Sequence, residues 1–306
     1  MGELVCNGLG KVYSGGKRAL SSVSFRIPTS GIFALIGRNG AGKTTLTRIL
    51  STLLEPSEGG ASIDGLDVMA DANRLRERMA VVPQEARAIA WMSPVQMITS
   101  YLLWRGLDLR EAKRRALDSV EKVGMREHAN KLNRNLSGGM KRKVLVAMVI
   151  ASGADLIFLD EPTTGLDPIS RKELWEILID LSKDRFLFIT THYLEEAERV
   201  ADRIGILDDG RLLVLGSMEE LRAKLPHQYS LRVSAGADLP TFEGEKRLGR
   251  DGQVQVLTSQ EDAMHISRSL LERKEKFSLN PVTLDDIFYQ MVGRTISSEV
   301  EEEDLK

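Results

Sequence analysis

A glycine-rich segment near the N-terminus has the residue types that bind phosphate. The spacing G-x-x-x-x-G-K-T is formed by Gly37, Gly42, Lys43 and Thr44, directly after the apolar run at residues 32–36. Glycines let backbone N–H groups surround phosphate oxygens, and the lysine and threonine reach the outer phosphates and Mg²⁺. The segment therefore predicts a site for a nucleoside triphosphate with Mg²⁺. Its predicted residues are Gly37, Arg38, Asn39, Gly40, Ala41, Gly42, Lys43, Thr44 and Thr45.

Two adjacent carboxylates follow another apolar run. The string LIFLDE ends in Asp160 and Glu161. An acid at the carboxyl end of a parallel strand, beside a phosphate loop, can hold Mg²⁺ through its water shell, which is the role predicted for Asp160. Glu161 can then accept the proton of a water molecule that attacks the γ-phosphate. A strand ending in Asp-Glu is commonly the start of a solvated loop, so the upstream phosphate loop decides for the catalytic interpretation.

A second anion site is indicated by the string LSGGM at residues 136–140. Ser137, Gly138 and Gly139 precede an apolar helix and are typical of an N-cap with an open helix N-terminus. The phosphate loop of the chain already serves one nucleotide. The second site is therefore predicted to bind a phosphate other than those of the nucleotide in the phosphate loop.

The order of these motifs resembles ATP-binding cassette (ABC) proteins. LSGGM is similar to the signature loop of that family, and Gln84 in VVPQ, Asp167 in TGLD and His192 in ITTHYLEEA follow the family order. The similarity covers residues 4–225. Residues 281–294 are similar to the tails of ATPases that serve drug-type and polysaccharide-type exporters.

The resemblance implies roles for the matching residues. Tyr13 would stack on adenine, Gln84 would sense Mg²⁺ and the γ-phosphate, and His192 would hold the γ-phosphate beside the catalytic Glu161. Two subunits, expected to be a homodimer with two competent sites, would sandwich two ATP molecules, with Asp167 crossing the interface. The metal ligands would be Thr44, Gln84 and Asp160. The nucleotide of the partner would meet Leu136, Ser137, Gly138, Gly139 and Met140.

Two positions depart from the family pattern. Met140 stands where the family usually has glutamine, and Arg38 stands where the phosphate loop commonly has proline. Neither change removes a group assigned to phosphate or metal. We expect Arg38 to add positive charge near the nucleotide.

The segment after Gln84 is expected to contact a separate membrane subunit, the permease. In the family this region forms a groove that receives a short permease helix. Trp91 supplies an aromatic anchor of the kind enriched at interface cores. The alternative is that Trp91 packs in the core of its own helical insert. The predicted contact residues are Ala88, Ile89, Trp91 and Met92.

Composition limits the partners and the location. The chain has 42 basic and 44 acidic residues and a net charge of −2, so it lacks the basic field of a nucleic-acid-binding protein. A single cysteine, Cys6, favours a reducing compartment. The N-terminus does not read as a secretory signal, and the most apolar run, residues 144–151, is shorter than the roughly 20 residues that span a bilayer. We expect a peripheral protein on the cytoplasmic face of the membrane.

The main alternative is an ABC ATPase that acts on ribosomes or nucleic acid. Ribosome-type members resemble two cassettes in tandem, and DNA-end types carry a long coiled coil between phosphate loop and signature. Here there is one cassette, without a sustained heptad run between Thr44 and Leu136. A GTPase is disfavoured because the nearest string to its guanine-reading motif is NKLN at 130–133, and intact catalytic residues argue against a purely regulatory protein. The C-terminal similarity favours export over import.

The elements that must position these residues follow from the hydrophobic pattern. With the resemblance, the pattern predicts an α/β P-loop NTPase of the ABC type, with a RecA-like core, an antiparallel β subdomain and a helical subdomain at about 85–160. Strands are expected at 4–12, 23–27, 32–36, 156–159 and 186–189, and helices at 94–123, 139–151 and 170–181. The cassette is predicted to span 1–225, followed by a small α+β accessory domain at 226–294 and an acidic, disordered tail at 295–306. The accessory domain is expected to contain strands at 229–233 and 254–257 and helices at 261–274 and 284–292.

Overall fold

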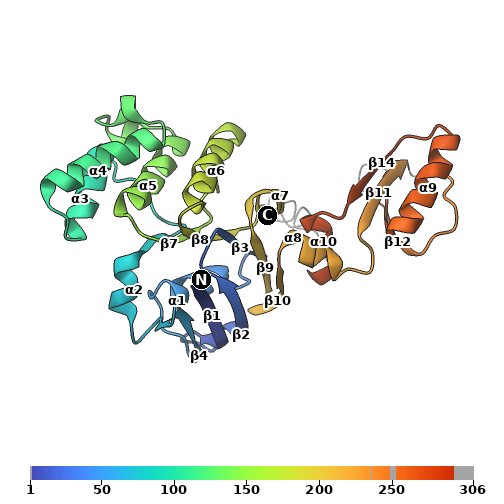
Figure 1. Cartoon of the computed structure of the whole chain (residues 1–306), viewed down its shortest axis with the longest axis horizontal. Coiled ribbons are helices and arrows are strands. Elements are labelled where there is room, and N and C mark those ends of the chain that lie inside the picture. Colours follow the sequence, from blue (N-terminus) through green and yellow to red (C-terminus); the bar gives the residue numbers. More distant parts are fainter. Residues whose placement is uncertain (1, 235, 249–252, 293–306) are drawn as a thin grey trace. The chain divides into compact units, whose positions relative to one another are not determined.

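The computed structural model describes residues 2–234, 236–248 and 253–292 (Figure 1). Its contacts divide the chain into two units, Met1–Leu215 and Gly216–Lys306. The predicted acidic tail at 295–306 lies outside the described residues. Within the described ranges, no helix combines the length and the apolar character needed to cross a bilayer.

The first unit begins with an antiparallel sheet in the order β2-β1-β4-β5. The strands are β1 Glu3–Val12, β2 Arg18–Pro28, β4 Glu58–Ile63 and β5 Leu66–Asp67. The turn between β1 and β2 is closed by the Tyr13 N–H, which donates to the Lys17 carbonyl at 2.9 Å. This turn holds Tyr13 at the end of its sheet.

A six-stranded sheet in the order β10-β9-β3-β8-β7-β6 forms the centre of the first unit, and its strands from β9 to β6 run parallel. Every residue of β3 and β7 is buried, as expected for continuous apolar runs covered on both faces. Neighbouring strands place Ile36 opposite Thr191 and Asp160 opposite Thr190. The carboxyl ends of β3, β7 and β8 therefore meet at one edge, where ligands bind in sheets of this kind. The strands are β3 Ile32–Ile36, β6 Met79–Val82, β7 Leu156–Asp160, β8 Phe186–Thr191, β9 Arg203–Asp208 and β10 Arg211–Gly216.

Helices surround the parallel sheet and form an insert after β6. The single helix predicted at 94–123 is two helices, α3 Pro94–Trp104 and α4 Leu109–Lys122. Gly106 (φ +89°) turns the chain, and the Asp108 carboxylate accepts the first free N–H groups of α4. Residues 156–160 belong to the parallel sheet, so the insert ends at Ser152 instead of near 160. The remaining helices are α1 Lys43–Leu50, α2 Ala72–Arg78, α5 Gly138–Ser152, α6 Pro168–Ser182 and α7 Leu194–Val200, with 3₁₀ turns at Arg126–His128 and Asn133–Asn135.

The second unit is an antiparallel sheet in the order β12-β13-β11-β14 with helices. Its apolar core joins β11 and β13 to α9 through Leu231, Val256 and Ile266. These contacts fit an α+β architecture with its own core. The strands are β11 Tyr229–Ser234, β12 Gly244–Leu248, β13 Gln253–Thr258 and β14 Phe277–Pro281, and the helices are α8 Met218–Ala223, α9 Gln260–Glu272 and α10 Leu284–Val292.

Candidate nucleotide site

The glycine-rich loop after β3 packs too closely on neighbouring backbone for any side chain at two positions. A Cβ at Gly37 would lie 2.1 Å from the Leu207 carbonyl oxygen, and one at Gly42 would lie 2.5 Å from that of Ala19. Gly42 also has φ +106°, which residues with a side chain rarely adopt. The glycines therefore fix the loop that starts α1 at Lys43.

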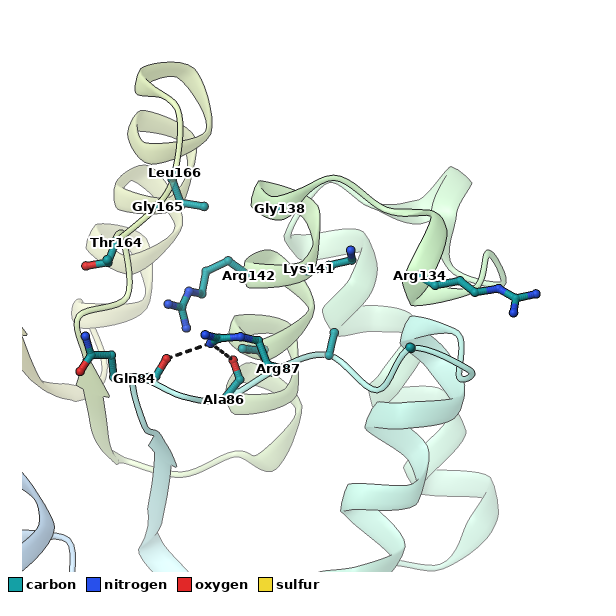
Figure 2. A pocket seen from close by; sticks show the side chains of 13 residues that line it. Gln84, Ala86, Arg87, Arg134, Gly138, Lys141, Arg142, Thr164, Gly165 and Leu166 are labelled. Atoms are coloured by element: carbon teal, nitrogen blue, oxygen red, sulfur yellow. Dashed lines mark hydrogen bonds between the residues drawn. The ribbon is translucent and has the colours of Figure 1, made fainter.

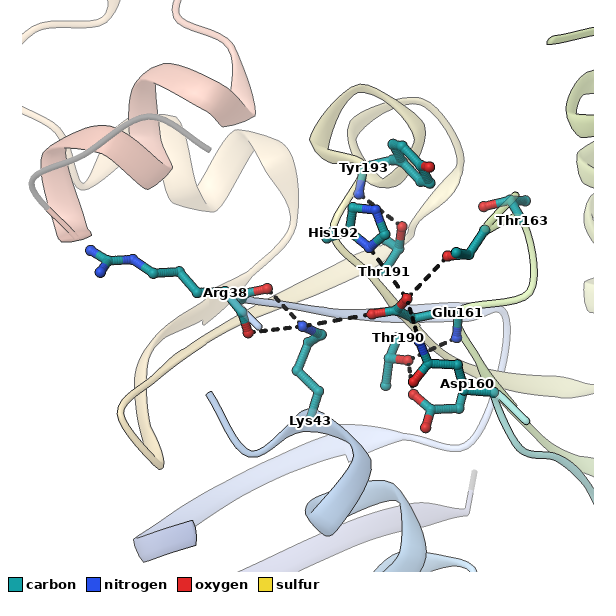
Figure 3. A network of polar contacts seen from close by, with 12 residues as sticks. Arg38, Lys43, Asp160, Glu161, Thr163, Thr190, Thr191, His192 and Tyr193 are labelled. Atoms are coloured by element: carbon teal, nitrogen blue, oxygen red, sulfur yellow. Dashed lines mark hydrogen bonds and ion pairs between the residues drawn. The ribbon is translucent and has the colours of Figure 1, made fainter. Parts of the chain in front are cut away.

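The Lys43 side chain is buried at the centre of this loop (Figure 3). Its Nζ donates to the carbonyls of Gly37 at 2.7 Å and Arg38 at 3.0 Å, and lies 4.0 Å from Glu161 Oε1. Burial lowers the pKa of Lys43, while the negative charges of Glu161 and Asp160 oppose that effect. The loop thus presents an ammonium group within reach of the carboxylate that follows β7.

Polar groups from three separate segments surround the Glu161 carboxylate, and Figure 3 shows His192 among them. Its Oε2 accepts from Gln84 Nε2 at 3.1 Å and from Thr164 Oγ1 at 3.0 Å, and lies 3.4 Å from His192 Nδ1. The contact with His192, and then the charge of Lys43, hold the pKa of Glu161 below its usual value, although burial opposes them. An ionised carboxylate that is 7 % exposed is suited to accept a proton.

The backbone of Glu161 adopts a left-handed conformation with φ +48°, which costs about 1 kcal/mol or more for a residue other than glycine. Its N–H donates to the Thr190 carbonyl and hydroxyl oxygens at 3.1 and 3.0 Å, and its carbonyl accepts from Arg142 Nη2 at 3.4 Å. The Thr190 hydroxyl also donates to the buried carboxylate of Asp160. These bonds hold the turn that aims Glu161 at Lys43. Thr164 and Thr190 belong to the TGLD and ITTHYLEEA strings, but no role was predicted for them, and Arg142 was not predicted at all.

A cavity of about 640 Å³ opens beside the loop, within the size range of small-molecule sites. Tyr13 lies at this cavity, 37 % exposed, with its hydroxyl 3.2 Å from Thr45 Oγ1. Lys17 also lines the cavity, although the sequence analysis did not predict it. The one signal for it in the sequence is its position in a glycine-rich turn after Tyr13. The lining residues are Tyr13, Ser14, Lys17, Ala19, Asn39, Gly40, Gly42, Lys43, Thr44, Thr45, Gln84, Glu161, Thr164 and His192.

Four residues of the predicted nucleotide and metal set do not line this cavity: Gly37, Arg38, Ala41 and Asp160. The Arg38 side chain extends away from Lys43, and its Nε lies 3.7 Å from Asp208 Oδ1 (Figure 3). The expected positive charge of Arg38 is therefore directed to Asp208, and only its backbone carbonyl contacts Lys43.

The signature residues begin a helix, as their types indicated. Ser137 Oγ accepts from the Met140 N–H at 3.2 Å and caps α5. Asp167 has the same function for α6, where its carboxylate accepts from the N–H groups of Ile169 and Ser170 at 3.1 and 3.0 Å. Within its own chain, the Asp167 side chain is thus engaged as a cap.

The buried residue Asn133 donates two hydrogen bonds to the segment that is expected to contact the permease. Asn133 Nδ2 donates to the Ile89 carbonyl at 3.0 Å, and its N–H donates to the Met92 carbonyl at 2.8 Å. Ala88 and Met92 pack on the core, whereas Trp91 is 74 % exposed. The alternative that Trp91 packs inside the insert is therefore wrong.

Comparison with solved structures supports the fold. CbiO1 from Clostridium perfringens, described as part of the ABC transporter complex cbiONQ, matches with a TM-score of 0.65 and 27 % identity over 72 % of this chain and 90 % of that chain. A dimeric ATP-binding cassette bound to ADP and Pi matches with a TM-score of 0.64 and 23 % identity over 70 % of this chain and 98 % of that chain. At that identity the second likeness shows the fold alone.

Sequence comparison extends over nearly the whole chain. The daunorubicin/doxorubicin resistance ATP-binding protein DrrA of Streptomyces peucetius is 33 % identical over 316 residues, covering 97 % of this chain and 94 % of that protein. ABC transporter A family member 3 of Arabidopsis thaliana is 34 % identical over 77 % of this chain, which spans 26 % of the plant protein. Residues 20–164 match the ABC transporter family. These relatives and the family match show that the chain belongs to the ATP-hydrolysing, ATP-binding subunits of ABC transporters.

Proposed function

We propose that this subunit hydrolyses Mg²⁺-bound ATP as a homodimer on the cytoplasmic face of a membrane and drives export through a separate permease. One observation carries the chemistry: the Glu161 carboxylate, held ionised, lies 4.0 Å from the ammonium of the phosphate-loop Lys43. A cation for the phosphates and a base for the attacking water thus meet at the edge of one sheet.

The residues of the cavity fit ATP. The open N-terminus of α1 and the Lys43 ammonium supply N–H donors and positive charge for the phosphates. Tyr13 offers an exposed aromatic face for the adenine ring, in the same cavity. The similar Streptomyces proteins are ATP-binding proteins by name, which supports this choice of ligand.

The residues proposed for Mg²⁺ all offer oxygen, which this cation prefers. Thr44 contributes a hydroxyl and Asp160 a carboxylate, the latter through water. Gln84 uses its amide NH₂ on Glu161, which leaves its amide oxygen for the metal. Held by these residues, Mg²⁺ would neutralise charge on the phosphoryl oxygens.

The hydrolysis step depends on the positions of Glu161, Lys43 and His192. Glu161 takes a proton from the water whose oxygen bonds to the γ-phosphorus, while the bond from that phosphorus to the bridging oxygen breaks and ADP leaves. Lys43 and His192 stand on either side of the Glu161 carboxylate, at 4.0 and 3.4 Å. In those places they can hold the transferred phosphoryl group.

The dimer is proposed from the signature helix. The N-terminus of α5, capped by Ser137, is an anion site separate from the phosphate loop. A second copy that presents its bound ATP there completes both sites, with Leu136–Met140 and Asp167 at the interface.

Export and membrane attachment are proposed from the relatives and from one surface. The similar Streptomyces proteins are drug-resistance ATP-binding proteins by name. Trp91 is a large aromatic side chain exposed on the segment after Gln84, which suits a docking anchor for a membrane subunit, with Ala88, Ile89 and Met92 beside it. A net charge of −2 gives no support to a nucleic-acid partner.

The test is phosphate release by the purified full chain as a function of its concentration. Because each site needs a second copy, the rate per subunit should rise with chain concentration and should vanish when EDTA removes Mg²⁺. Wild type mixed with an excess of Glu161→Gln should lose activity through mixed dimers. A rate per subunit that stays constant where the chain is monomeric would contradict the shared site.

A further inference from the structure

The His192 side chain, proposed to hold the γ-phosphate, depends on ring packing for its orientation. Among the described residues its Nδ1 has no hydrogen-bond partner, although it is buried and lies 3.4 Å from Glu161 Oε2. The Tyr193 ring lies beside the imidazole, with 4.2 Å between the ring centroids and 38° between the ring planes (Figure 3). Because a side chain without a fixed hydrogen bond can turn about its torsions, the Tyr193 ring is a contact that limits the orientation of the imidazole.

Tyr193 in turn packs against a cation from α6. The guanidinium carbon of Arg171 lies 4.2 Å from the centroid of the Tyr193 ring, well within the roughly 6 Å of a cation–π contact. The Tyr193 N–H donates to Thr191 Oγ1 at 3.0 Å, which fixes the backbone of this residue. The Tyr193 ring is thus in contact with both Arg171 and His192.

Two further contacts fix the Arg171 guanidinium. Its Nε lies 3.1 Å from Glu196 Oε1, and its Nη2 donates to the Leu166 carbonyl at 3.3 Å. The side chains of the ion pair are 28 % and 11 % exposed, so solvent screens this pair less than a pair at the surface. Leu166 belongs to the loop between β7 and α6, which Figure 2 shows with Thr164 and Gly165. One side chain therefore joins this loop to α7.

Glu196 connects the same cluster to the residues that follow the general base. Its Oε2 accepts from the Thr163 hydroxyl at 2.9 Å, and Thr163 is fully buried. Glu196 lies in the first turn of α7, where the helix dipole stabilises a carboxylate. The loop after Glu161 and the helix after His192 are thus held together by the ion pair of Arg171 and Glu196.

These contacts suit arginine and no other cation at position 171. A guanidinium is planar, so its face can stack on an aromatic ring while its edge meets a carboxylate and a carbonyl. A lysine ammonium in the same place would lose the stacking. Loss of the stacking would release the Tyr193 ring and, with it, the imidazole of His192.

We propose that Arg171 is a positioning residue that orients His192 through the ring of Tyr193. The inference rests on the proposed function, in which His192 holds the γ-phosphate beside Glu161, and it names the group that keeps the imidazole there. Arg171 also donates to the Leu166 carbonyl, directly before Asp167. The loop proposed for the dimer interface and the imidazole therefore share one support.

The first experiment is a double-mutant cycle between Arg171 and His192, measured as phosphate release by the full chain at saturating ATP and Mg²⁺. Arg171→Gln should lower kcat about tenfold and leave the KM for ATP within about threefold, because a misplaced group slows the chemical step while the contacts to the nucleotide remain. In the His192→Gln background the same change should lower kcat by less than about twofold, since the imidazole that Arg171 positions is gone. Lys172→Gln, at the exposed neighbouring position on α6, is the matched control and should behave as wild type.

A role of Arg171 confined to packing predicts a different result. If Arg171 only stabilises α6 and α7, its replacement lowers kcat by the same factor with and without His192. That result would overturn the inference and leave the proposed function intact, as would an unchanged kcat in Arg171→Gln. A His192→Gln chain that hydrolyses ATP at the wild-type rate would contradict the proposed role of His192, and this inference with it.

The second experiment compares two replacements of Tyr193 and stays informative if Arg171→Gln does not fold. Tyr193→Phe keeps the ring, so kcat should stay within about twofold of the wild type. Tyr193→Leu removes the ring and should lower kcat about tenfold at a nearly unchanged KM, with the fold checked by circular dichroism. Equal kcat in the two folded variants would overturn the inference, because the ring would then have no part in placing His192.

Discussion

Replacement of Glu161 by glutamine isolates the general base from the rest of the site. Glutamine has nearly the same shape, and its amide oxygen can still accept from Gln84 Nε2 and Thr164 Oγ1, now at 3.1 and 3.0 Å. What disappears is the negative charge that lies 4.0 Å from Lys43 Nζ and 3.4 Å from His192 Nδ1. We therefore expect Glu161→Gln to fold, with ATP binding at least as tight as in the wild type, because a like charge beside the triphosphate is gone.

The expected loss is in turnover. General bases contribute about 10²–10⁴-fold to rates, which corresponds to about 3–5 kcal/mol in the barrier, and kcat should fall by that factor. Phosphate release measures kcat, titration with a fluorescent ATP analogue measures binding, and size-exclusion chromatography should show an ATP-bound dimer that persists. Glu176→Gln, on the exposed side of α6, is the matched control and should behave as wild type.

Two results would refute this reasoning about Glu161. A kcat within about threefold of the wild type would mean that another group takes the proton, since a lost base costs far more. A Glu161→Gln chain that no longer binds ATP would mean that the carboxylate supports the fold of the loop and not the proton transfer.

Further predictions concern the residues around the base. Lys43→Ala should weaken ATP binding at least about tenfold in the same titration, because charge-assisted hydrogen bonds to phosphate are lost. Tyr13→Ala should raise the KM for ATP about fivefold or more with kcat nearly unchanged, since only stacking is removed. His192→Gln removes the main cause of the lowered Glu161 pKa, so the acid limb of the kcat profile should move to higher pH. Trp91→Ala should change the free energy of unfolding by less than about 1 kcal/mol, against about 3–5 for a core tryptophan, while abolishing recovery with the permease.

The domain division makes a separate prediction. The structure divides the chain after Leu215, earlier than the predicted boundary at Leu225. A chain that ends at Leu225 therefore keeps the whole first unit and every motif residue, so we expect it to bind ATP as the full chain does. Dimer stability or coupling to the permease would then depend on the second unit. A truncated chain that is folded by circular dichroism and does not bind ATP would contradict the division.

The elements that the sequence predicted well are those with strong local patterns. The buried strand at 32–36, the glycine loop and the helix behind it follow from apolar runs and from backbone positions that only glycine tolerates. The break between α3 and α4 was missed, although Gly106 and Asp108 are a turn residue and a cap, because apolar residues continue on both sides. Periodicity outweighed the local turn signal there.

Several contacts around Glu161 join segments that are far apart in the chain. Gln84 lies 77 residues before it in the chain, and the two meet because β6 and β7 are neighbours in the sheet. Arg142 reaches the Glu161 carbonyl from α5, across another 19 residues. Such distances are set by sheet order and by helix packing, which a motif does not encode. For the same reason the cavity between Arg142 and the segment after Gln84 (Figure 2) becomes visible only once the chain is folded, and no motif indicates that Arg142 Nη1 is buried there without a hydrogen-bond partner.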